Sequence, residues 1–260
     1  MRRSKMLAKL RSGGLARVCG LGHFLPFYIR YASLYKYDGI WLDLEHRAMG
    51  SREVQALLAL CQKNDIDCMV RPPTYERTRL YRYLEEGASG FMMPFTSSGD
   101  IARHIVECVK FPPLGNRGID GAGMDGDYLL DAWRPGSTYT ADANRETFVV
   151  GQIETPEAVT NIDEIAGVDG IDVLFVGPAD LGLRLAAGTA GRNLSVAEAI
   201  ERVADAARRH GKAWGTTVGS TEEMARLRKM GAQILPWGGD FDLRTVLKTR
   251  SEEIDATIHE

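Results

Sequence analysis

The sequence is poor in cysteine, and none of its cysteines is arranged in a pair typical of metal binding or redox chemistry. Among 260 residues there are only four cysteines, and no two of them form a C-x-x-C motif. Cys61, Cys68 and Cys108 lie in or beside apolar segments, where a cysteine serves as a small hydrophobic side chain. This pattern indicates no disulfide framework, and we expect a reducing, cytoplasmic environment.

The sequence also lacks long apolar runs and a strong charge of either sign. Nowhere do about 18 apolar residues follow one another, and the basic segment 1–14 is not followed by the apolar stretch of a signal peptide. We therefore expect neither export through a signal peptide nor a membrane span. The net charge of −3 gives no general attraction for nucleic acid or for an anionic membrane, so we expect small soluble molecules as partners.

Two further motifs are absent from the sequence, and each absence argues against a class of enzyme. No G-x-G-x-x-G motif opens a helix after the first predicted strand, which argues against a dinucleotide-binding fold. No lysine lies at the end of a predicted strand, where an aldolase that works through an imine would need one. Activation of a carbonyl group would therefore have to come from a metal ion or an arginine.

An alternation of strands and helices runs through the whole chain. The apolar segment 173–176 has no polar alternation and is followed by Gly177-Pro178, as is typical of a strand buried on both faces of a parallel sheet. We predict eight strands, at 16–22, 39–43, 67–71, 90–94, 148–154, 172–176, 212–217 and 233–237. Because no two-residue hairpin signal separates them, the pattern predicts a single α/β domain, residues 1–260, folded as a (β/α)8 TIM barrel. An open doubly wound sheet is the alternative.

The alternation is interrupted once, by the irregular segment 112–146. This segment is rich in glycine and aspartate, and we expect an insertion within the single domain, with a short helix near 128–133. A loop of this length inside a compact domain is usually functional or mobile.

Two carboxylates follow neighbouring strands at the end where barrel enzymes carry their chemistry. Glu154 ends the strand 148–154 and Asp180 follows the strand 172–176, so both can meet on one hard divalent cation. Gln152 shares the face of Glu154 by the two-residue period of a strand. The backbone amides of Ala179 and Asp180 open a helix, where they can hold a substrate carboxylate. The structural alternative for both acids is compensation of a helix N-terminus.

Three more polar residues end or follow earlier strands. Asp43 and His46 are three residues apart after the second strand, so the carboxylate can orient the imidazole and make His46 the best general base. The alternative is an exposed histidine beside a capping aspartate. Arg71 ends the third strand before two prolines, and its guanidinium suits a carboxylate or an enolate oxygen. An ion pair with Asp43 or Glu45 is the structural alternative for Arg71.

The chain resembles the HpcH/HpaI family of class II, metal-dependent pyruvate aldolases. The segments that carry the resemblance are L-D-L-E-H at 42–46, V-R-P at 70–72, P-P-L-G-N-R-G at 112–118, Q-I-E-T at 152–155 and F-V-G-P-A-D-L at 175–181. They occur in order and cover almost the whole chain. The resemblance implies a barrel of the phosphoenolpyruvate/pyruvate type, whose last helix is often exchanged between subunits of a homo-oligomer, as a hexamer built as a trimer of dimers or as a trimer.

The resemblance also implies roles for the residues at the strand ends. Mg, Mn or Co would be held by Glu154 and Asp180, and His46, oriented by Asp43, would act with a water as the base. Arg71 would stabilise an enolate, and the 2-oxo acid would be bound by Gln152 and by the amides of Ala179 and Asp180. The implied reaction is reversible cleavage of a 4-hydroxy-2-oxo acid into pyruvate, or a related 2-oxo acid, and an aldehyde. Citrate-type condensation or lysis, oxaloacetate decarboxylation and a non-catalytic barrel that binds an acidic metabolite are the alternatives.

Two features set the chain apart from the resemblance. Members often carry a small residue or a proline after E-H, whereas this chain has Arg47. The segment 119–145 also differs from the better known aldolases. We expect the aldehyde pocket to involve the first strand and the loops at 217–220 and 237–240.

Overall fold

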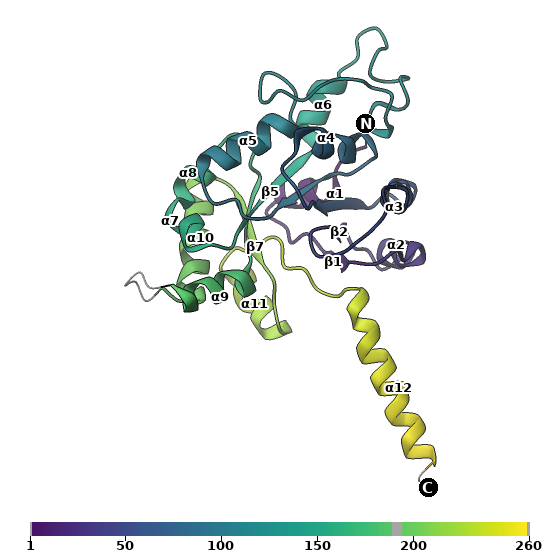
Figure 1. The fold of residues 1–260 in the computed structure, drawn as a ribbon, viewed down its shortest axis with the longest axis vertical. Coiled ribbons are helices and arrows are strands. Elements are labelled where there is room, and N and C mark those ends of the chain that lie inside the picture. The colour runs from purple at the N-terminus through teal and green to yellow at the C-terminus, as the bar shows by residue number, and fades with distance from the viewer. Residues whose placement is uncertain (1, 189–193, 259–260) are drawn as a thin grey trace.

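A parallel sheet of seven strands, curled on itself, forms the centre of the computed structural model, which describes residues 2–188 and 194–258 (Figure 1). The strands pair in chain order, and every pair is parallel. Their bounds are β1 Val18–Leu21, β2 Gly39–Asp43, β3 Asp67–Arg71, β4 Gly90–Met93, β5 Phe148–Ile153, β6 Val173–Val176 and β7 Ala213–Thr216. These are the first seven predicted strands, to within two residues at each end.

Helices alternate with the strands, and most of them cover the outer face of the sheet (Figure 1). They are α1 Lys5–Arg11, α2 Pro26–Leu34, α3 Ser51–Lys63, α4 Arg77–Glu85, α5 Gly99–Val109, α6 Tyr139–Glu146, α7 Pro156–Thr160, α8 Ile162–Ala166, α9 Pro178–Ala187, α10 Val196–His210, α11 Thr221–Lys229 and α12 Leu243–Ile258. Two short 3₁₀ helices, η1 Met124–Gly126 and η2 Asp240–Asp242, lie in loops. None of the helices in the described ranges is both long enough and apolar enough to cross a bilayer.

The prediction of an eighth strand at 233–237 is wrong. This segment makes isolated parallel bridges, from Ile234 to Gly215 and to Ala16, and from Gly239 to Gly20. Pro236 has no amide hydrogen to donate, which interrupts a regular ladder at that point. Because the bridges reach both β1 and β7, the segment connects the two edges of the curled sheet. The fold is thus a parallel α/β structure with a curled seven-stranded sheet, consistent with a TIM-like barrel.

The inside of the curled sheet is a packed apolar core, closed at the N-terminal ends of the strands by α1. Inward-facing side chains such as Met69, Phe148 and Phe175 are fully buried, and they form one cluster with Met6 and Leu10 of α1. The amphipathic outer helices make a second, larger core against the other face.

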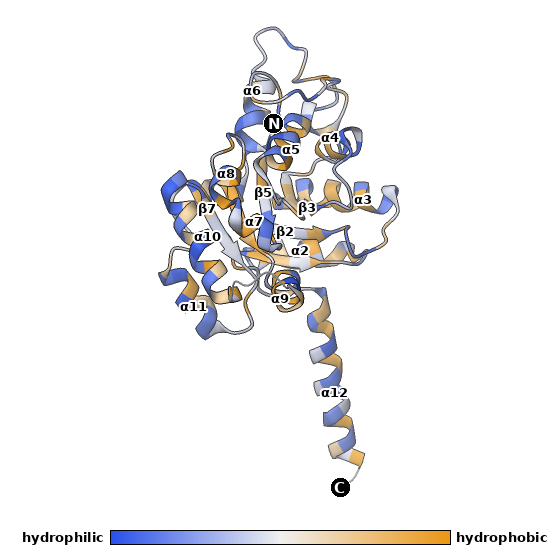
Figure 2. Ribbon diagram, turned by 60° about the vertical axis from the view of Figure 1, so that its left-hand side comes forward, coloured by the Kyte–Doolittle hydropathy of each residue, from blue (hydrophilic) through white to orange (hydrophobic). Residues whose placement is uncertain are grey.

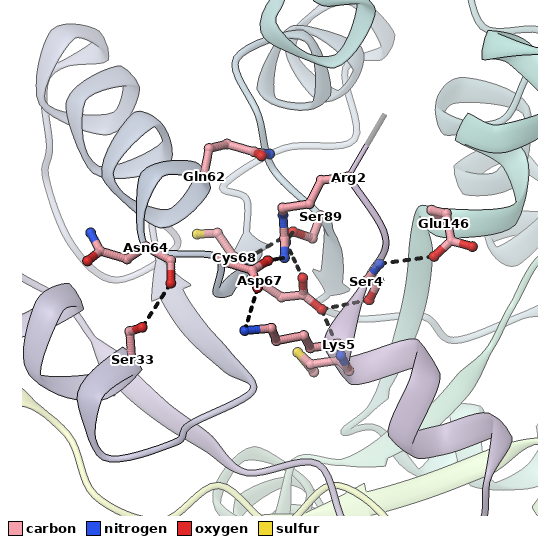
Figure 3. Close-up of polar contacts among 12 residues, drawn as sticks. Arg2, Ser4, Lys5, Ser33, Gln62, Asn64, Asp67, Cys68, Ser89 and Glu146 are labelled. Atoms are coloured by element: carbon pink, nitrogen blue, oxygen red, sulfur yellow. Dashed lines mark hydrogen bonds and ion pairs between the residues drawn. The ribbon is translucent and has the colours of Figure 1, made fainter.

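A buried carboxylate at the start of β3 fixes α1 in this position (Figure 3). Asp67 accepts a hydrogen bond from Ser4 Oγ at 2.6 Å and from the amide of Met6 at 2.8 Å, and it pairs with Arg2. Ser4 also caps the helix by accepting from Leu7. Within the described residues, α1 therefore closes this end of the curled sheet.

The 112–146 insertion lies beside α4 on the same side as the N-terminus (Figure 1). It is held together by a buried ion pair of 2.5 Å between Arg117 and Asp125, whose carboxylate also accepts from Tyr139 Oη at 2.7 Å. The helix predicted at 128–133 is wrong, because Tyr128 and Leu129 adopt positive φ values that no α-helix contains. The helix of this insertion is α6 instead.

The last helix, α12, projects from the rest of the chain (Figures 1 and 2). None of its described residues is buried. Its exposed apolar side chains are Leu243, Val246, Leu247, Ile254 and Ile258. The exchange of this helix between subunits, which the family resemblance implies, involves a second chain and stays a prediction.

Candidate active site

Arg71 is held in a fixed orientation at the C-terminal end of β3. The register of β2 and β3 places Asp43 directly beside it. Arg71 Nε lies 3.0 Å from Asp43 Oδ1 and Nη2 lies 2.8 Å from Oδ2, while Glu45 Oε2 is 3.2 Å from Nε. The guanidinium also stacks 5.0 Å from the ring centre of Trp41. In the described part of the chain Nη1 of Arg71 has no protein partner, so one edge of the fork remains available to a ligand.

The same contacts set the charge of Asp43. Burial works against ionisation of this carboxyl group, but the hydrogen bonds and the positive charge of Arg71 together hold the pKa of Asp43 below its usual value. The backbone amides of Glu45 and His46 add to this effect. Asp43 is therefore a carboxylate that organises its surroundings and has no tendency to take up a proton near neutral pH.

The structure does not place the carboxylate of Asp43 against the imidazole of His46. Asp43 Oδ1 accepts from the backbone amides of Glu45 at 3.1 Å and His46 at 3.4 Å, as aspartate commonly does with residues two and three positions on. The imidazole Nε2 of His46 instead lies 3.4 Å from Glu45 Oε2, and its side chain is 53% exposed. Glu45 is thus the carboxylate that can orient the histidine.

Glu154 is a buried carboxyl group one residue beyond β5. Its Oε1 accepts from the amide of Phe95 at 2.7 Å, and its Oε2 accepts from Gln152 Nε2 at 2.6 Å. Burial raises the pKa of Glu154 to about 7; the negative charges of Glu45 and Asp180 act in the same direction, and the hydrogen bond from Phe95 opposes them. No lysine or arginine of the described ranges forms an ion pair with Glu154.

Asp180 lies in the first turn of α9, and its charge acts on Glu154. Because β5 and β6 pair Ile153 with Val176, the following residues Glu154 and Gly177 are neighbours. A Cβ at Gly177 would lie 2.8 Å from Glu154 Oε2 and 2.9 Å from Gln152 Nε2, so the glycine leaves the space that these side chains occupy. The carboxylate of Asp180 binds Arg184, with Nη1 and Oδ1 2.6 Å apart.

The donor set at this point fits a hard divalent cation. Burial and the negative charges of Glu45 and Asp180 raise the pKa of Glu154, and burial raises the pKa of Glu45 as well. Gln152 Oε1 is buried and has no hydrogen-bond partner. Oxygen atoms of this kind are the ligands that Mg²⁺ and Mn²⁺ prefer. No group of three or more His, Cys, Asp or Glu side chains in the described residues forms a complete metal site.

A cavity of about 490 Å³ opens at the mouth of the barrel beside Asp43 and Arg71. It is lined by the end of β1 at Gly20–Gly22, by Val218 and by the loop from Pro236 to Asp242. These are the segments from which the sequence predicted the second substrate pocket. No residue of the 112–146 insertion is among those that line it, so within the described part of one chain this insertion does not shape the mouth.

Sequence reasoning missed Trp41, and it included Asp240 only as the last residue of the 237–240 loop, without a role of its own. Trp41 lies on the face of Asp43 by the two-residue period of β2, so the signal that paired Gln152 with Glu154 was also available here. Asp240 is buried, and it accepts from the amide of Gly22 at 2.9 Å and pairs with His23 Nδ1 at 2.7 Å. Because Asp240 follows an irregular segment, no local sequence pattern indicated these contacts.

Comparisons with known proteins agree over most of the chain. The model of the HpcH/HpaI aldolase/citrate lyase family matches residues 22–247. A hydroxypyruvate/pyruvate aldolase from Roseovarius nubinhibens is 30% identical over 250 residues, which cover 94% of this chain and 96% of that protein.

Solved structures give the same picture of the fold. The HpcH/HpaI aldolase from Desulfitobacterium hafniense DCB-2 has a TM-score of 0.83 at 30% identity, covering 98% of this chain and 96% of that chain. The citrate synthase SbnG has a TM-score of 0.79 at 25% identity, covering 94% of this chain and 96% of that chain. The similar proteins thus include one named as an aldolase and one named as a citrate synthase.

Proposed function

Because the chain belongs to the HpcH/HpaI aldolase/citrate lyase family and is a carbon–carbon lyase, we propose that it reversibly cleaves a 4-hydroxy-2-oxo acid. The products would be pyruvate, or a related 2-oxo acid, and an aldehyde. The observation that carries the proposal is that one end of the sheet holds both a preorganised guanidinium, that of Arg71, and a buried acid of raised pKa, Glu154. Such a pair suits a reaction in which negative charge develops on an enolate oxygen.

Members of the family generally depend on a divalent metal, and we propose that Mg, Mn or Co is held here by Glu154 and Asp180. Support comes from the raised pKa of Glu154, whose negative charge a cation would stabilise. The buried Oε1 of Gln152 has no hydrogen-bond partner, and a water bound to the cation would supply one. When bound, the ion supplies Lewis-acid polarisation of the 2-oxo acid. Arg184, which now pairs with Asp180, competes with a cation for that carboxylate.

The protein groups around the substrate would act as follows. Arg71 presents its free Nη1 edge to the enolate oxygen, and because Asp43, Glu45 and Trp41 already fix the guanidinium, little reorganisation is needed in the transition state. His46, with a water, takes the proton of the 4-hydroxyl group, and Glu45 stabilises the imidazolium that results.

The 2-oxo acid would be oriented at its carboxylate. The amides of Ala179 and Asp180 lie in the first turn of α9, where amide hydrogens have no partner within the helix. Gln152 would complete this binding site from β5. These roles of His46, Gln152 and the α9 amides are proposals that the placement of the residues supports.

Citrate-type condensation is the second candidate, favoured by the likeness to SbnG. It keeps enolate chemistry but changes the electrophile or the source of the enolate. Condensation of pyruvate with a 2-oxo acid would share its first half with the aldolase reaction, in which the methyl group of pyruvate exchanges protons with the solvent, whereas formation of citrate itself would need a two-carbon acetyl donor.

We expect this exchange to be observed when the protein is incubated with Mn²⁺ or Mg²⁺ and pyruvate in D₂O. Proton NMR would follow loss of the methyl signal, and chelation of the metal should stop it. Pyruvate binding without any exchange would overturn the proposed function and favour a non-catalytic metabolite-binding barrel. Aldehydes and oxaloacetate would be supplied in turn, and the masses of the products would be measured by mass spectrometry. These masses would distinguish aldol chemistry from citrate-type condensation and from decarboxylation.

We also propose a homo-oligomer, either a trimer or a hexamer built as a trimer of dimers. The support is α12, which projects from the rest of the described chain (Figure 2), has no buried residue and carries exposed apolar side chains along its length. Light scattering on the purified protein should give three or six times the mass of one chain, and a stable monomer would contradict the proposal.

A further inference from the structure

Another cavity, of about 400 Å³, lies between α3 and α4. Its lining comes from the loop after β2, from the first turn of α3 and from α4, and its charged and hydroxyl-bearing members are Arg47, Ser51, Arg79, Arg82, Tyr83 and Glu86. Gln55 of α3 donates to Glu86 Oε1 at 2.8 Å, and Gln62 of the same helix donates to the carbonyl of Gly87 at 3.0 Å. These hydrogen bonds join α3 to the end of α4, so the cavity has fixed walls.

Two arginines of α4 bring positive charge to this cavity. Neither Arg79 nor Arg82 forms an ion pair with a carboxylate of residues 2–188 and 194–258. They lie three positions apart on one helix, where like charges repel each other. Arg47 also lines the cavity, but its guanidinium stacks on Phe241 at the mouth of the barrel. An anion held between Arg79 and Arg82 would therefore replace a repulsion by two attractions.

Tyr83 supplies a neutral donor beside these charges. The residue is only 8% exposed, and its ring packs edge-on against Phe91 of β4. In the described part of the chain its hydroxyl forms no hydrogen bond, yet the oxygen stays accessible and the residue lines the cavity. Burial raises the pKa of Tyr83, while the charge of Arg79 lowers it and that of Glu86 raises it, so the hydroxyl lies within reach of both. A buried phenol whose hydroxyl opens on a cavity is placed to donate to a ligand there.

The start of α3 adds backbone donors to the same cavity, where Gly50 and Ser51 belong to the lining. Gly50 precedes the helix and has no side chain that could accept from its first amides. The amides of residues 51–53 have no acceptor in the described ranges, and Glu53 Oε2 accepts from the amide of Gly50 instead, at 2.7 Å. Free amides at a helix start carry partial positive charge and bind anions such as phosphate.

We propose that this cavity binds a small molecule through a phosphate group. Donors reach it from α4, as two guanidinium groups and a hydroxyl, and from the start of α3, as backbone amides. A phosphate presents oxygens in all these directions, whereas one guanidinium satisfies both oxygens of a carboxylate. Its charge of about −1.5 to −2 suits two arginines, which Glu86 offsets only in part. The volume leaves room for an organic part, so a phosphomonoester fills it better than free phosphate.

The test is calorimetric titration of inorganic phosphate and of glycerol 3-phosphate into the full-length protein without substrate. We expect one bound anion per chain and tighter binding of glycerol 3-phosphate, whereas equal affinity for the two would identify free phosphate as the ligand of the same site. Arg79→Gln and Arg82→Gln should each weaken binding by roughly 10-fold or more, the usual effect of losing a hydrogen bond between charged groups. Tyr83→Phe removes only a hydroxyl, and it should weaken binding by roughly 5-fold or more.

Arg30→Gln is the matched control, because Arg30 is an exposed arginine of α2 that lines no part of this cavity. It should bind both compounds as wild type does. Arg71→Ala should also keep the affinity, since Arg71 lines the mouth of the barrel and not this cavity. Loss of binding in Arg71→Ala would place the anion at the mouth and overturn the inference.

Two further results would overturn the inference. One is that wild type binds neither compound at millimolar concentration, or binds them no more tightly than Arg79→Gln and Arg82→Gln do. The other is weaker binding in the arginine variants without any change in Tyr83→Phe, which would show an adventitious ion only, attracted by surface charge. Binding at this cavity requires neither the metal nor the reaction proposed above, so these results leave the proposed function untouched.

Discussion

Replacing Arg71 with alanine should lower turnover in the pyruvate-forming direction by about 10²-fold or more, as loss of a preorganised oxyanion donor does. The guanidinium is only 12% exposed and is fixed by Asp43, Glu45 and Trp41, so it needs no rearrangement as charge develops on the substrate. Arg71→Lys keeps a positive charge but cannot form the same fork, and we expect it to recover only a small part of the rate.

The ion pairs of Arg71 offer a second explanation for a loss of turnover in Arg71→Ala, and this explanation can be tested. Removing the arginine takes away the cation that pairs with both Asp43 and Glu45, and this change in charge could by itself disturb the site. Combining Asp43→Asn with Arg71→Ala removes one of those charges. If Arg71 acts on the substrate, the double variant stays as slow as the single one in steady-state kinetics. Recovery of most of the activity, or wild-type turnover by Arg71→Ala alone, would show that Arg71 only balances charge.

Residues on regular strands could be placed from the sequence, because a strand has a fixed period and a fixed direction. The two-residue alternation puts Gln152 and Glu154 on one face, and the structure has their side chains hydrogen-bonded. The apolar run of β6 followed by Gly177-Pro178 indicates where a helix begins, and α9 starts at Pro178. Parallel pairing in chain order then places Glu154 beside Gly177.

Residues in loops could not be placed in the same way. The three-residue spacing of Asp43 and His46 is compatible with a side-chain contact or with a hydrogen bond to the backbone, and only the folded loop shows the second. Pro236 and the glycines after it prevent an eighth regular strand, although the apolar pattern of 233–237 is typical of one. Asp240 reaches Gly22 from 218 residues further along the chain, a separation that no local pattern spans.

Glu154→Gln should lower cation-dependent activity by about 10³-fold or more, since a metal that stabilises an enolate lowers the activation free energy by several kcal/mol. Glutamine keeps the volume of the side chain and an oxygen to accept from the amide of Phe95, so the local fold is retained. It lacks the negative charge that a divalent cation needs. Glu157→Gln, three residues further on and exposed on α7, is the matched control and should behave as wild type.

The same variant should lose the stabilisation that Mn²⁺ gives to the folded protein. Thermal unfolding measured with the metal alone, without substrate, provides this readout independently of activity. We expect wild type and Glu157→Gln to melt at a higher temperature when Mn²⁺ is added, and Glu154→Gln to show no such rise. An equal rise in all three proteins would place the cation elsewhere.

In a chelator, Glu154 should make the stability of wild type depend on pH. Its pKa of about 7 in the folded protein lies above the ordinary value of 4.5, so the folded state holds this proton more tightly than the unfolded chain does. The free energy of unfolding should therefore fall as pH rises from about 4.5 to 7, by roughly 3 kcal/mol at most. Glu154→Gln has no such proton to lose. Urea unfolding at pH 5 and pH 7.5 would give the free energy of unfolding of both proteins, and we expect wild type to lose stability relative to Glu154→Gln at the higher pH. If the difference between the two free energies is the same at both pH values, the carboxylate of Glu154 is charged even without a cation.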